Sequence, residues 1–132
     1  MRQETDLCPE TSSRLFVAVV TVVNRSDRGP DEGSQYAEEC RTLKIPYIFD
    51  PGQQCTRMSG PELQDGLVGA RILICNDYEF ELIRQKTAMG ETEILAVTDA
   101  LVVTRGEEGC SIYKGSSRVD VKAVPPHRIV DP

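Results

Sequence analysis

The apolar positions of the chain follow two patterns that alternate along the sequence. Short runs rich in Val, Ile and Leu are typical of strands buried on both faces of a parallel sheet. Segments whose apolar residues recur every three or four positions are typical of helices with one buried face. The patterns predict strands at residues 15–23, 46–50, 71–75 and 100–104, and helices at residues 34–43, 59–68, 76–86 and 91–97.

This alternation predicts one α/β domain. Strands that alternate with helices form a mostly parallel sheet through right-handed crossovers, and we expect helices on both faces. The near-continuous β-branched run at 15–23 predicts a central strand, and the polar, Gly- and Pro-rich residues 24–33 predict a loop. Residues 110–114 and 118–124 predict a carboxyl-terminal hairpin. Residues 1–13 are a polar lead-in, and residues 14–132 form the domain.

Composition narrows the class of partner. Aromatic residues make up 5% of the chain and Trp is absent, so the core must consist of aliphatic side chains. The net charge of −6 argues against nucleic acid and against an anionic membrane surface, because both attract Lys and Arg. A nucleotide remains compatible with this charge, since backbone amides and a metal ion can hold its phosphates.

The five cysteines have no CxxC spacing. Cys40 and Cys75 have apolar neighbours, which predicts buried free thiols and a reducing, cytoplasmic compartment. The amino-terminal residues do not have the pattern of a signal peptide, and the apolar run at 15–23 is too short to span a bilayer. We therefore expect a cytoplasmic protein.

Candidate chemistry follows the predicted strand at 100–104. Thr104 ends this strand, and Gly106 and Gly109 flank two carboxylates directly after it. In an open α/β sheet, ligands bind beyond the carboxyl ends of the strands. Glycines there let backbone N–H groups approach a phosphate. The same residues are also compatible with a tight turn between two strands.

The strand at 71–75 leads into a second candidate pair. Asn76 and Glu79 have the spacing of a helix capping box, and in the same position they could support a metal ion and phosphates; both roles are compatible. Asp50 is either a turn residue or a ligand at the same edge, and Asp131 could bind a cation. His127 is the only histidine, so the chain offers little for histidine-based nucleophilic catalysis. The sequence also has no cluster of residues with the spacing of zinc or iron ligands.

Four blocks of sequence carry a resemblance to a known family. In order along the chain they are KIPYIFDPGQQ, ILICNDYEFELI, ALVVTRGEEGCSIY and PPHRIVDP. Together they resemble the ribokinase-like sugar and nucleoside kinases of the PfkB family, most closely the bacterial adenosine-kinase-like and carbohydrate-kinase members. The resemblance implies a doubly wound, mostly parallel α/β fold. It also implies transfer of the γ-phosphoryl group of ATP to a hydroxymethyl group of a nucleoside or sugar.

The resemblance also assigns residues. In the family, the N-x-x-E motif that matches Asn76 and Glu79 supports Mg²⁺ and the phosphates. The T-x-G-x-x-G turn that matches Thr104, Gly106 and Gly109 contacts the nucleotide phosphates. The aspartate that matches Asp131 is associated with a monovalent cation such as K⁺.

One family motif has no counterpart here. The family aspartate that matches Asp131 precedes a Gly-Ala-Gly-Asp stretch, which supplies an anion hole and the catalytic base, whereas this sequence ends at Pro132. The amino-terminal Gly-Gly substrate motif and the lid strands also lack a match. We therefore expect a central fragment of such a kinase, with no catalytic residue of its own and no turnover in isolation. The acceptor stays undetermined.

Two other functions are compatible with the pattern. The chain could be a non-catalytic remnant that binds nucleotide or associates with itself through an exposed sheet edge. It could also be a receiver-type signalling domain that uses Asp50 and Thr104. The latter is less favoured, because no acidic pair follows the first strand.

Overall fold

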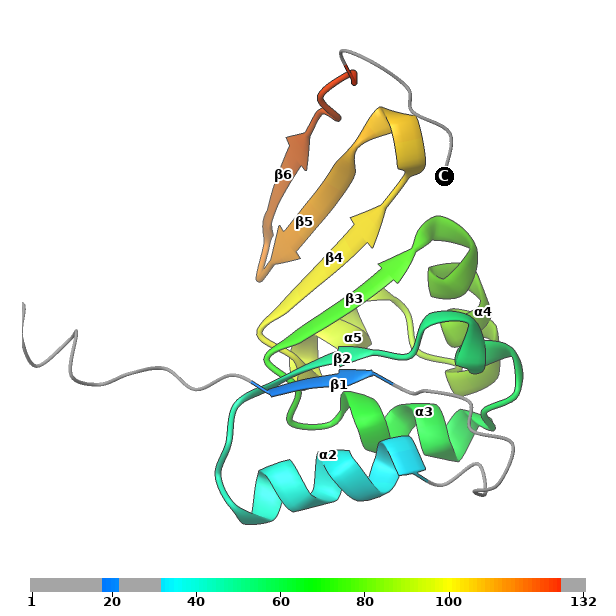
Figure 1. Ribbon diagram of the computed structural model, residues 1–132, viewed down its shortest axis with the longest axis vertical. Coiled ribbons are helices and arrows are strands. Elements are labelled where there is room, and N and C mark those ends of the chain that lie inside the picture. Colours follow the sequence, from blue (N-terminus) through cyan, green and yellow to red (C-terminus); the bar gives the residue numbers. More distant parts are fainter. Residues whose placement is uncertain (1–17, 22–31, 127–132) are drawn as a thin grey trace, which may run out of the picture.

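The computed structural model describes residues 18–21 and 32–126, with side chains from residue 35 onward. The lead-in at 1–13, most of the loop at 24–33, His127 and Asp131 lie outside this part. Figure 1 shows strands and helices in alternation. The elements are β1 (Ala18–Thr21), α2 (Glu32–Thr42), β2 (Tyr47–Asp50), the 3₁₀ helix η1 (Gly52–Thr56), α3 (Gly60–Leu67), β3 (Ile72–Asn76), α4 (Asp77–Thr87), α5 (Glu91–Val97), β4 (Ala100–Thr104), the 3₁₀ helix η2 (Gly106–Glu108), β5 (Cys110–Lys114) and β6 (Ser117–Val121).

The described strands form one six-stranded sheet in the order β1-β2-β3-β4-β5-β6. The first four strands are parallel, and β5 and β6 are antiparallel. The predicted mostly parallel α/β fold and its carboxyl-terminal hairpin are therefore confirmed. The parallel arrangement brings the carboxyl ends of β1 to β4 to one edge of the sheet.

The helices between these strands cover one face of the sheet (Figure 1). On β2, β3 and β4, alternate residues are buried, and the strand register places Phe49, Leu73 and Leu101 on this face. They share a single core cluster with residues from all four α-helices. The expectation of helices on both faces is wrong for the described residues. The strand order follows the sequence without a reversal, so right-handed crossovers all lie on the same side.

Strand β1 pairs only with β2 in the described sheet, so it lies at an edge. The prediction of a parallel strand within residues 15–23 is confirmed, and the prediction of a central position is wrong for this part of the chain. A β-branched run indicates a strand with two buried faces, but it does not determine how many strands flank it.

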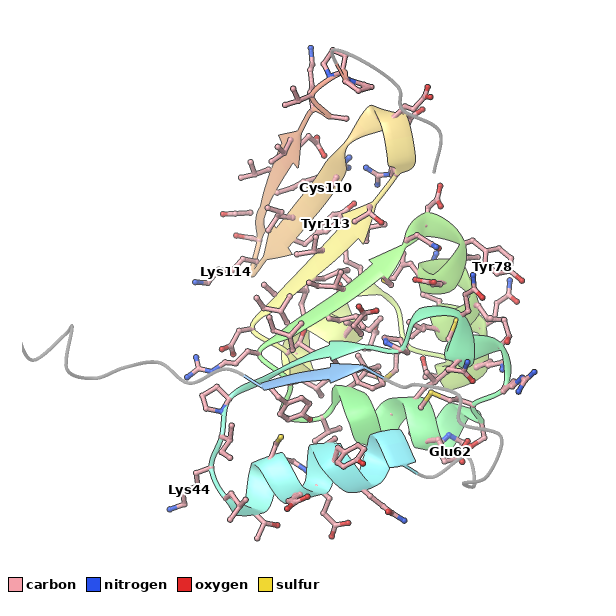
Figure 2. All side chains as sticks on the ribbon, viewed as in Figure 1. Lys44, Glu62, Tyr78, Cys110, Tyr113 and Lys114 are labelled. Carbon is pink, nitrogen blue, oxygen red and sulfur yellow. The ribbon has the colours of Figure 1, made fainter. Side chains whose placement is uncertain are left out.

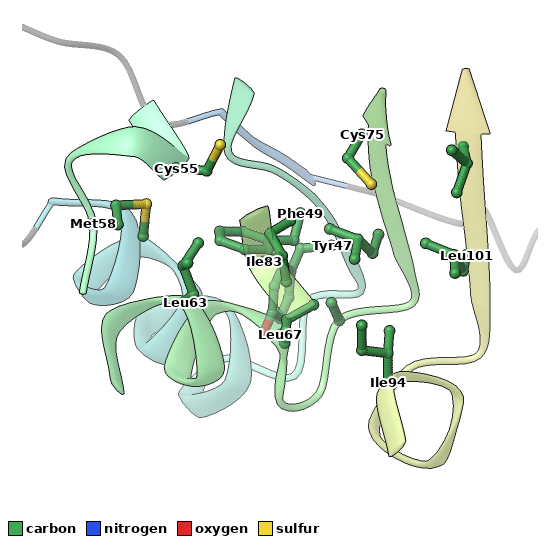
Figure 3. Packing of buried hydrophobic residues seen from close by; sticks show 14 of the residues in the cluster. Tyr47, Phe49, Cys55, Met58, Leu63, Leu67, Cys75, Ile83, Ile94 and Leu101 are labelled. Atoms are coloured by element: carbon green, nitrogen blue, oxygen red, sulfur yellow. The ribbon is translucent and has the colours of Figure 1, made fainter. Parts of the chain in front are cut away.

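Helix α3 lies directly on strand β2, and Figure 3 shows the packing around Phe49. Gly66 permits the close approach, because a Cβ atom there would overlap the Phe49 ring. The Tyr47 hydroxyl donates to the carbonyl oxygen of Val68 at 2.8 Å and accepts from Arg41 at 3.1 Å. These contacts fix α2 and α3 against the sheet, below the edge where the candidate residues lie.

Candidate active site

Two of the predicted site residues lie side by side. Asn76 is the last residue of β3, Thr104 is the last residue of β4, and the two are paired in the register of the parallel strands. Thr104 is exposed and Asn76 is half-buried. The structure therefore places the two motifs of the sequence at one point on the carboxyl edge of the sheet.

Asn76 and Glu79 form the predicted capping box at the start of α4. The Asn76 side-chain oxygen accepts from the Glu79 amide at 2.7 Å, and Glu79 Oε2 accepts from the Asn76 amide at 2.9 Å. This reciprocal pair satisfies two backbone donors at the helix terminus, where intrahelical acceptors are missing. The box also fixes the orientation of the Glu79 carboxylate at the edge of the sheet.

The second oxygen of Glu79 distinguishes the residue from an ordinary cap. Glu79 is 9% exposed, and no described residue donates to its Oε1 atom. A buried carboxylate oxygen without a partner is costly unless a cation or water is available. The negative charge also contributes to the raised pKa of the Cys75 thiol, for which burial is the larger cause.

A polar cavity of about 460 Å³ opens beside Glu79. Its volume falls within the range of about 300–1,000 Å³ that is usual for small-molecule sites. One wall is the start of α4, from which the exposed Tyr78 projects (Figure 2), and the other wall is η1 with the residue after it. The cavity is lined by Gln53, Gln54, Cys55, Thr56, Arg57, Asn76, Tyr78 and Glu79.

Two glycines of the predicted phosphate turn have different roles. Both adopt positive φ, +55° at Gly106 and +99° at Gly109. A Cβ atom at Gly109 would overlap the backbone of β6, whereas the space around Gly106 is open. The Gly109 amide donates to the Gly106 carbonyl at 3.1 Å, and no described group accepts from the Gly106 and Glu107 amides. Gly109 therefore has a packing role, and only the start of the turn presents free N–H groups.

The turn is fixed to the hairpin by a side-chain network that the sequence pattern did not reveal. The Arg105 guanidinium donates to the hydroxyls of Ser111 and Tyr113. Ser111 is fully buried and donates to Asp120, which also accepts from Arg118 at 3.0 Å. The hydrogen bond from Ser111 and that from Arg118 lower the pKa of Asp120. The polar residues at alternate hairpin positions were the available signal.

The remaining sequence candidates are not brought into this site. Asp50 is half-buried at the end of β2, separated from Thr104 by strand β3, and does not line the cavity. Asp131 and His127 lie outside the described residues. The four cysteines in the described part of the chain are free, and Cys40, Cys55 and Cys75 are buried, as predicted for Cys40 and Cys75. Within residues 18–21 and 32–126, no three His, Cys, Asp or Glu side chains gather to hold a metal.

The fold is an α/β domain with a polar cavity at the carboxyl ends of its parallel strands, which is where α/β proteins usually bind ligands. The family model for pfkB family carbohydrate kinases matches residues 16–132. The chain therefore belongs to the pfkB family of carbohydrate kinases. None of the helices described here is long and apolar enough to cross a membrane.

The chain is similar to nucleoside kinases of two archaea. It is 27% identical over 93 residues to that of Thermoplasma acidophilum, which covers 70% of this chain and 31% of the relative. It is 29% identical over 84 residues to that of Methanocaldococcus jannaschii, a match that covers 64% of this chain and 28% of the relative. The chain thus spans less than a third of the length of these relatives.

Solved structures show the same fold. A Burkholderia thailandensis nucleoside kinase in complex with inosine has a TM-score of 0.79 and 32% identity, over 91% of this chain and 39% of its own. The Methanocaldococcus jannaschii nucleoside kinase, described as an archaeal member of the ribokinase family, has a TM-score of 0.77 and 22% identity. The match covers 88% of this chain and 37% of that protein. The ribokinase-like fold predicted from the sequence is therefore confirmed.

Proposed function

We propose that the carboxyl edge of β3 and β4 is part of the nucleotide site of an ATP-dependent kinase. The observation that carries the proposal is the Glu79 carboxylate, which lines the cavity, is buried and is fixed through Oε2, while no described residue donates to its Oε1. Membership of the pfkB family supports ATP as the phosphoryl donor.

The donor set fits a magnesium ion. Hard oxygen ligands suit Mg²⁺, which keeps several waters and binds through one or two carboxylates together with substrate phosphates. Glu79 would therefore hold the ion through water, in line with the absence of a three-residue ligand cluster in the described chain. When bound, the ion neutralises charge on the phosphates.

The neighbouring residues have roles of their own. Asn76 holds the Glu79 backbone and carboxylate in place through the capping box. In the proposed site, Thr104 at the same edge would offer its hydroxyl, and the Gly106 and Glu107 amides would donate to the phosphates. Gly109 lets the turn pack on β6. Asp131, as the family pattern implies, would serve a monovalent cation such as K⁺.

We propose a nucleoside as the phosphoryl acceptor, with transfer to its hydroxymethyl group. Support comes from the nucleoside kinases among the relatives and from the 32% identity to a protein whose structures hold inosine or ADP-inosine. A sugar is the alternative acceptor within the family. The 132-residue sequence contains no Gly-Ala-Gly-Asp stretch, so we expect this chain alone to bind nucleotide without turnover.

A non-catalytic interaction module is the second candidate. All five residues of the edge strand β6 are exposed, including Val119 and Val121, and exposed edge strands favour association. This candidate requires no nucleotide, so a nucleotide-binding measurement separates the two functions.

The substitution Glu79→Gln tests the proposal. Gln retains a side-chain oxygen for the cap but removes the charge, so we expect Mg-ADP affinity to fall about tenfold or more, as for a lost charged contact. Isothermal titration with Mg-ADP measures the change.

Glu81→Gln is the matched control. Glu81 is exposed two residues further along α4, where it pairs with Arg84 at 2.9 Å. We expect its variant to bind Mg-ADP like the unmodified chain. Equal affinity of the Glu79→Gln variant and the unmodified chain would contradict the role of Glu79.

A further inference from the structure

We propose that Lys86 is a positioning residue that holds η1 against α4 and so sets the shape of the nucleotide cavity. This inference rests on the proposed function for its link to the nucleotide. The cavity has two walls, η1 and the first turn of α4, which are separated by about twenty residues of sequence. Cys55 of η1 is buried in the core, and the Lys86 side chain adds the hydrogen bonds that hold the η1 backbone to α4.

The Lys86 ammonium group uses all three of its donors on one segment. It donates to the carbonyl oxygens of Cys55 at 2.8 Å, Thr56 at 2.7 Å and Met58 at 2.7 Å. An ammonium group has three donors and no acceptor, so these bonds saturate it. The three carbonyls lie at the end of a short 3₁₀ helix, where intrahelical donors are missing. A cation at this end also complements the helix dipole.

Lys86 also lies on a rigid support. It belongs to the last turn of α4, and its own carbonyl contacts Gly60, where a Cβ atom would overlap it. At the next residue, the Thr87 carbonyl accepts from Gln64 at 3.0 Å. The backbone of α4 is thus fixed to α3 at the point from which Lys86 reaches η1. The Lys86 side chain thereby holds η1, one wall of the cavity, in a fixed position relative to α3 and α4.

Apart from Lys86, η1 is ordered by its own backbone hydrogen bonds and by the burial of Cys55 in the core. Its backbone bonds run within residues 51–58, and Cys55 supplies its buried side chain. Gln53, Thr56 and Arg57 are exposed, so their positions over the cavity follow from the backbone that carries them. If Lys86 loses its donors, the wall should move away from Glu79 while the α4 cap remains intact.

The test compares Lys86→Met with Lys86→Arg in the 132-residue chain. Met has a similar length and no donors, whereas Arg retains a charged donor group. Lys114→Met is the matched control, because Lys114 is exposed at the distant hairpin turn (Figure 2). We measure amide hydrogen exchange without nucleotide and Mg-ADP affinity by titration.

We expect Lys86→Met to accelerate exchange at residues 54–58 and to weaken Mg-ADP binding about tenfold, as for a displaced binding wall. Lys86→Arg should keep both the exchange rates at residues 54–58 and the Mg-ADP affinity close to those of the unmodified chain. Lys114→Met should change neither quantity. Unchanged exchange at 54–58, or acceleration spread evenly over the whole chain, would overturn the proposal. The exchange readout uses no nucleotide, so an unmodified chain that binds no Mg-ADP refutes the proposed function without affecting this test.

Discussion

At the scale of single residues, Glu79 has a structural role in the α4 cap and a proposed chemical role in the nucleotide site. One carboxylate oxygen caps α4, and the residue also lines the polar cavity. A capping glutamate can also lie partly in solvent, as Glu62 does at the start of α3. The burial of Glu79, with no described residue donating to its Oε1, is the observation behind the proposed ion site.

Gly66 is the residue on which the packing of α3 depends most directly. Gly66→Ala would place a methyl group inside the Phe49 ring, so the helix must move or the ring must rotate. Overpacking of a core typically costs about 1–3 kcal/mol. Urea unfolding should show a loss of this size. Glu38→Ala on the exposed side of α2 is the control, with an expected change within about 0.5 kcal/mol. A stability equal to that of the unmodified chain would refute the contact.

At the scale of elements, α3 and α4 begin with the same capping box, one at Ser59 and one at Asn76. Only Asn76 lies on the edge of the cavity. Ser59→Ala and Asn76→Ala should each lower the free energy of unfolding by about 1 kcal/mol, the usual value of a lost cap. Only Asn76→Ala should also weaken Mg-ADP binding. Equal binding by both variants would mean that Asn76 is a cap and nothing more.

Elements with strong local signals were predictable from sequence. The helix at 91–97 and the strands at 100–104 and 110–114 were predicted with the bounds that the structure has. The buried face of a helix was less predictable. In the predicted helix at 34–43, one apolar face is formed by the spacing of Tyr36, Ala37, Cys40 and Leu43. Only Ala37 and Cys40 are buried, whereas Tyr36 and Leu43 are exposed. Periodicity indicates which residues share a side, but the packing partner decides how much of that side is covered.

The cavity wall could not be predicted, for a physical reason. Residues 50–52 indicated a turn, but a 3₁₀ segment such as η1 has no periodic signal of its own. Its position depends on Lys86, which is about thirty residues away in sequence and bonds to carbonyls rather than to side chains. Every residue has a backbone carbonyl, so the residue types at 55–58 do not indicate this contact.

At the scale of the whole molecule, the sequential strand order decides which face of the sheet the helices cover. Helices occupy one face, and on the other face Ile74, Val102, Ile112 and Val119 form a row across four strands by register. The first three are half-buried, and Val119 is 57% exposed. The strand pattern predicted two covered faces because it shows which residues are apolar. It does not show whether a helix covers them. The ligand edge depends only on the parallel direction of the strands, which the alternation of elements predicts.

The most direct test of the nucleotide site is a map of where Mg-ADP binds on the 132-residue chain. Heteronuclear NMR titration should shift the amides of residues 53–57, 76–79 and 104–107, which surround the carboxyl edge of β3 and β4. The amides of α2 and α5, at a distance from this edge, should stay in place. Shifts that fall on α2 or the β5–β6 turn instead, or no shift at millimolar Mg-ADP, would contradict the assignment of this edge as a nucleotide site.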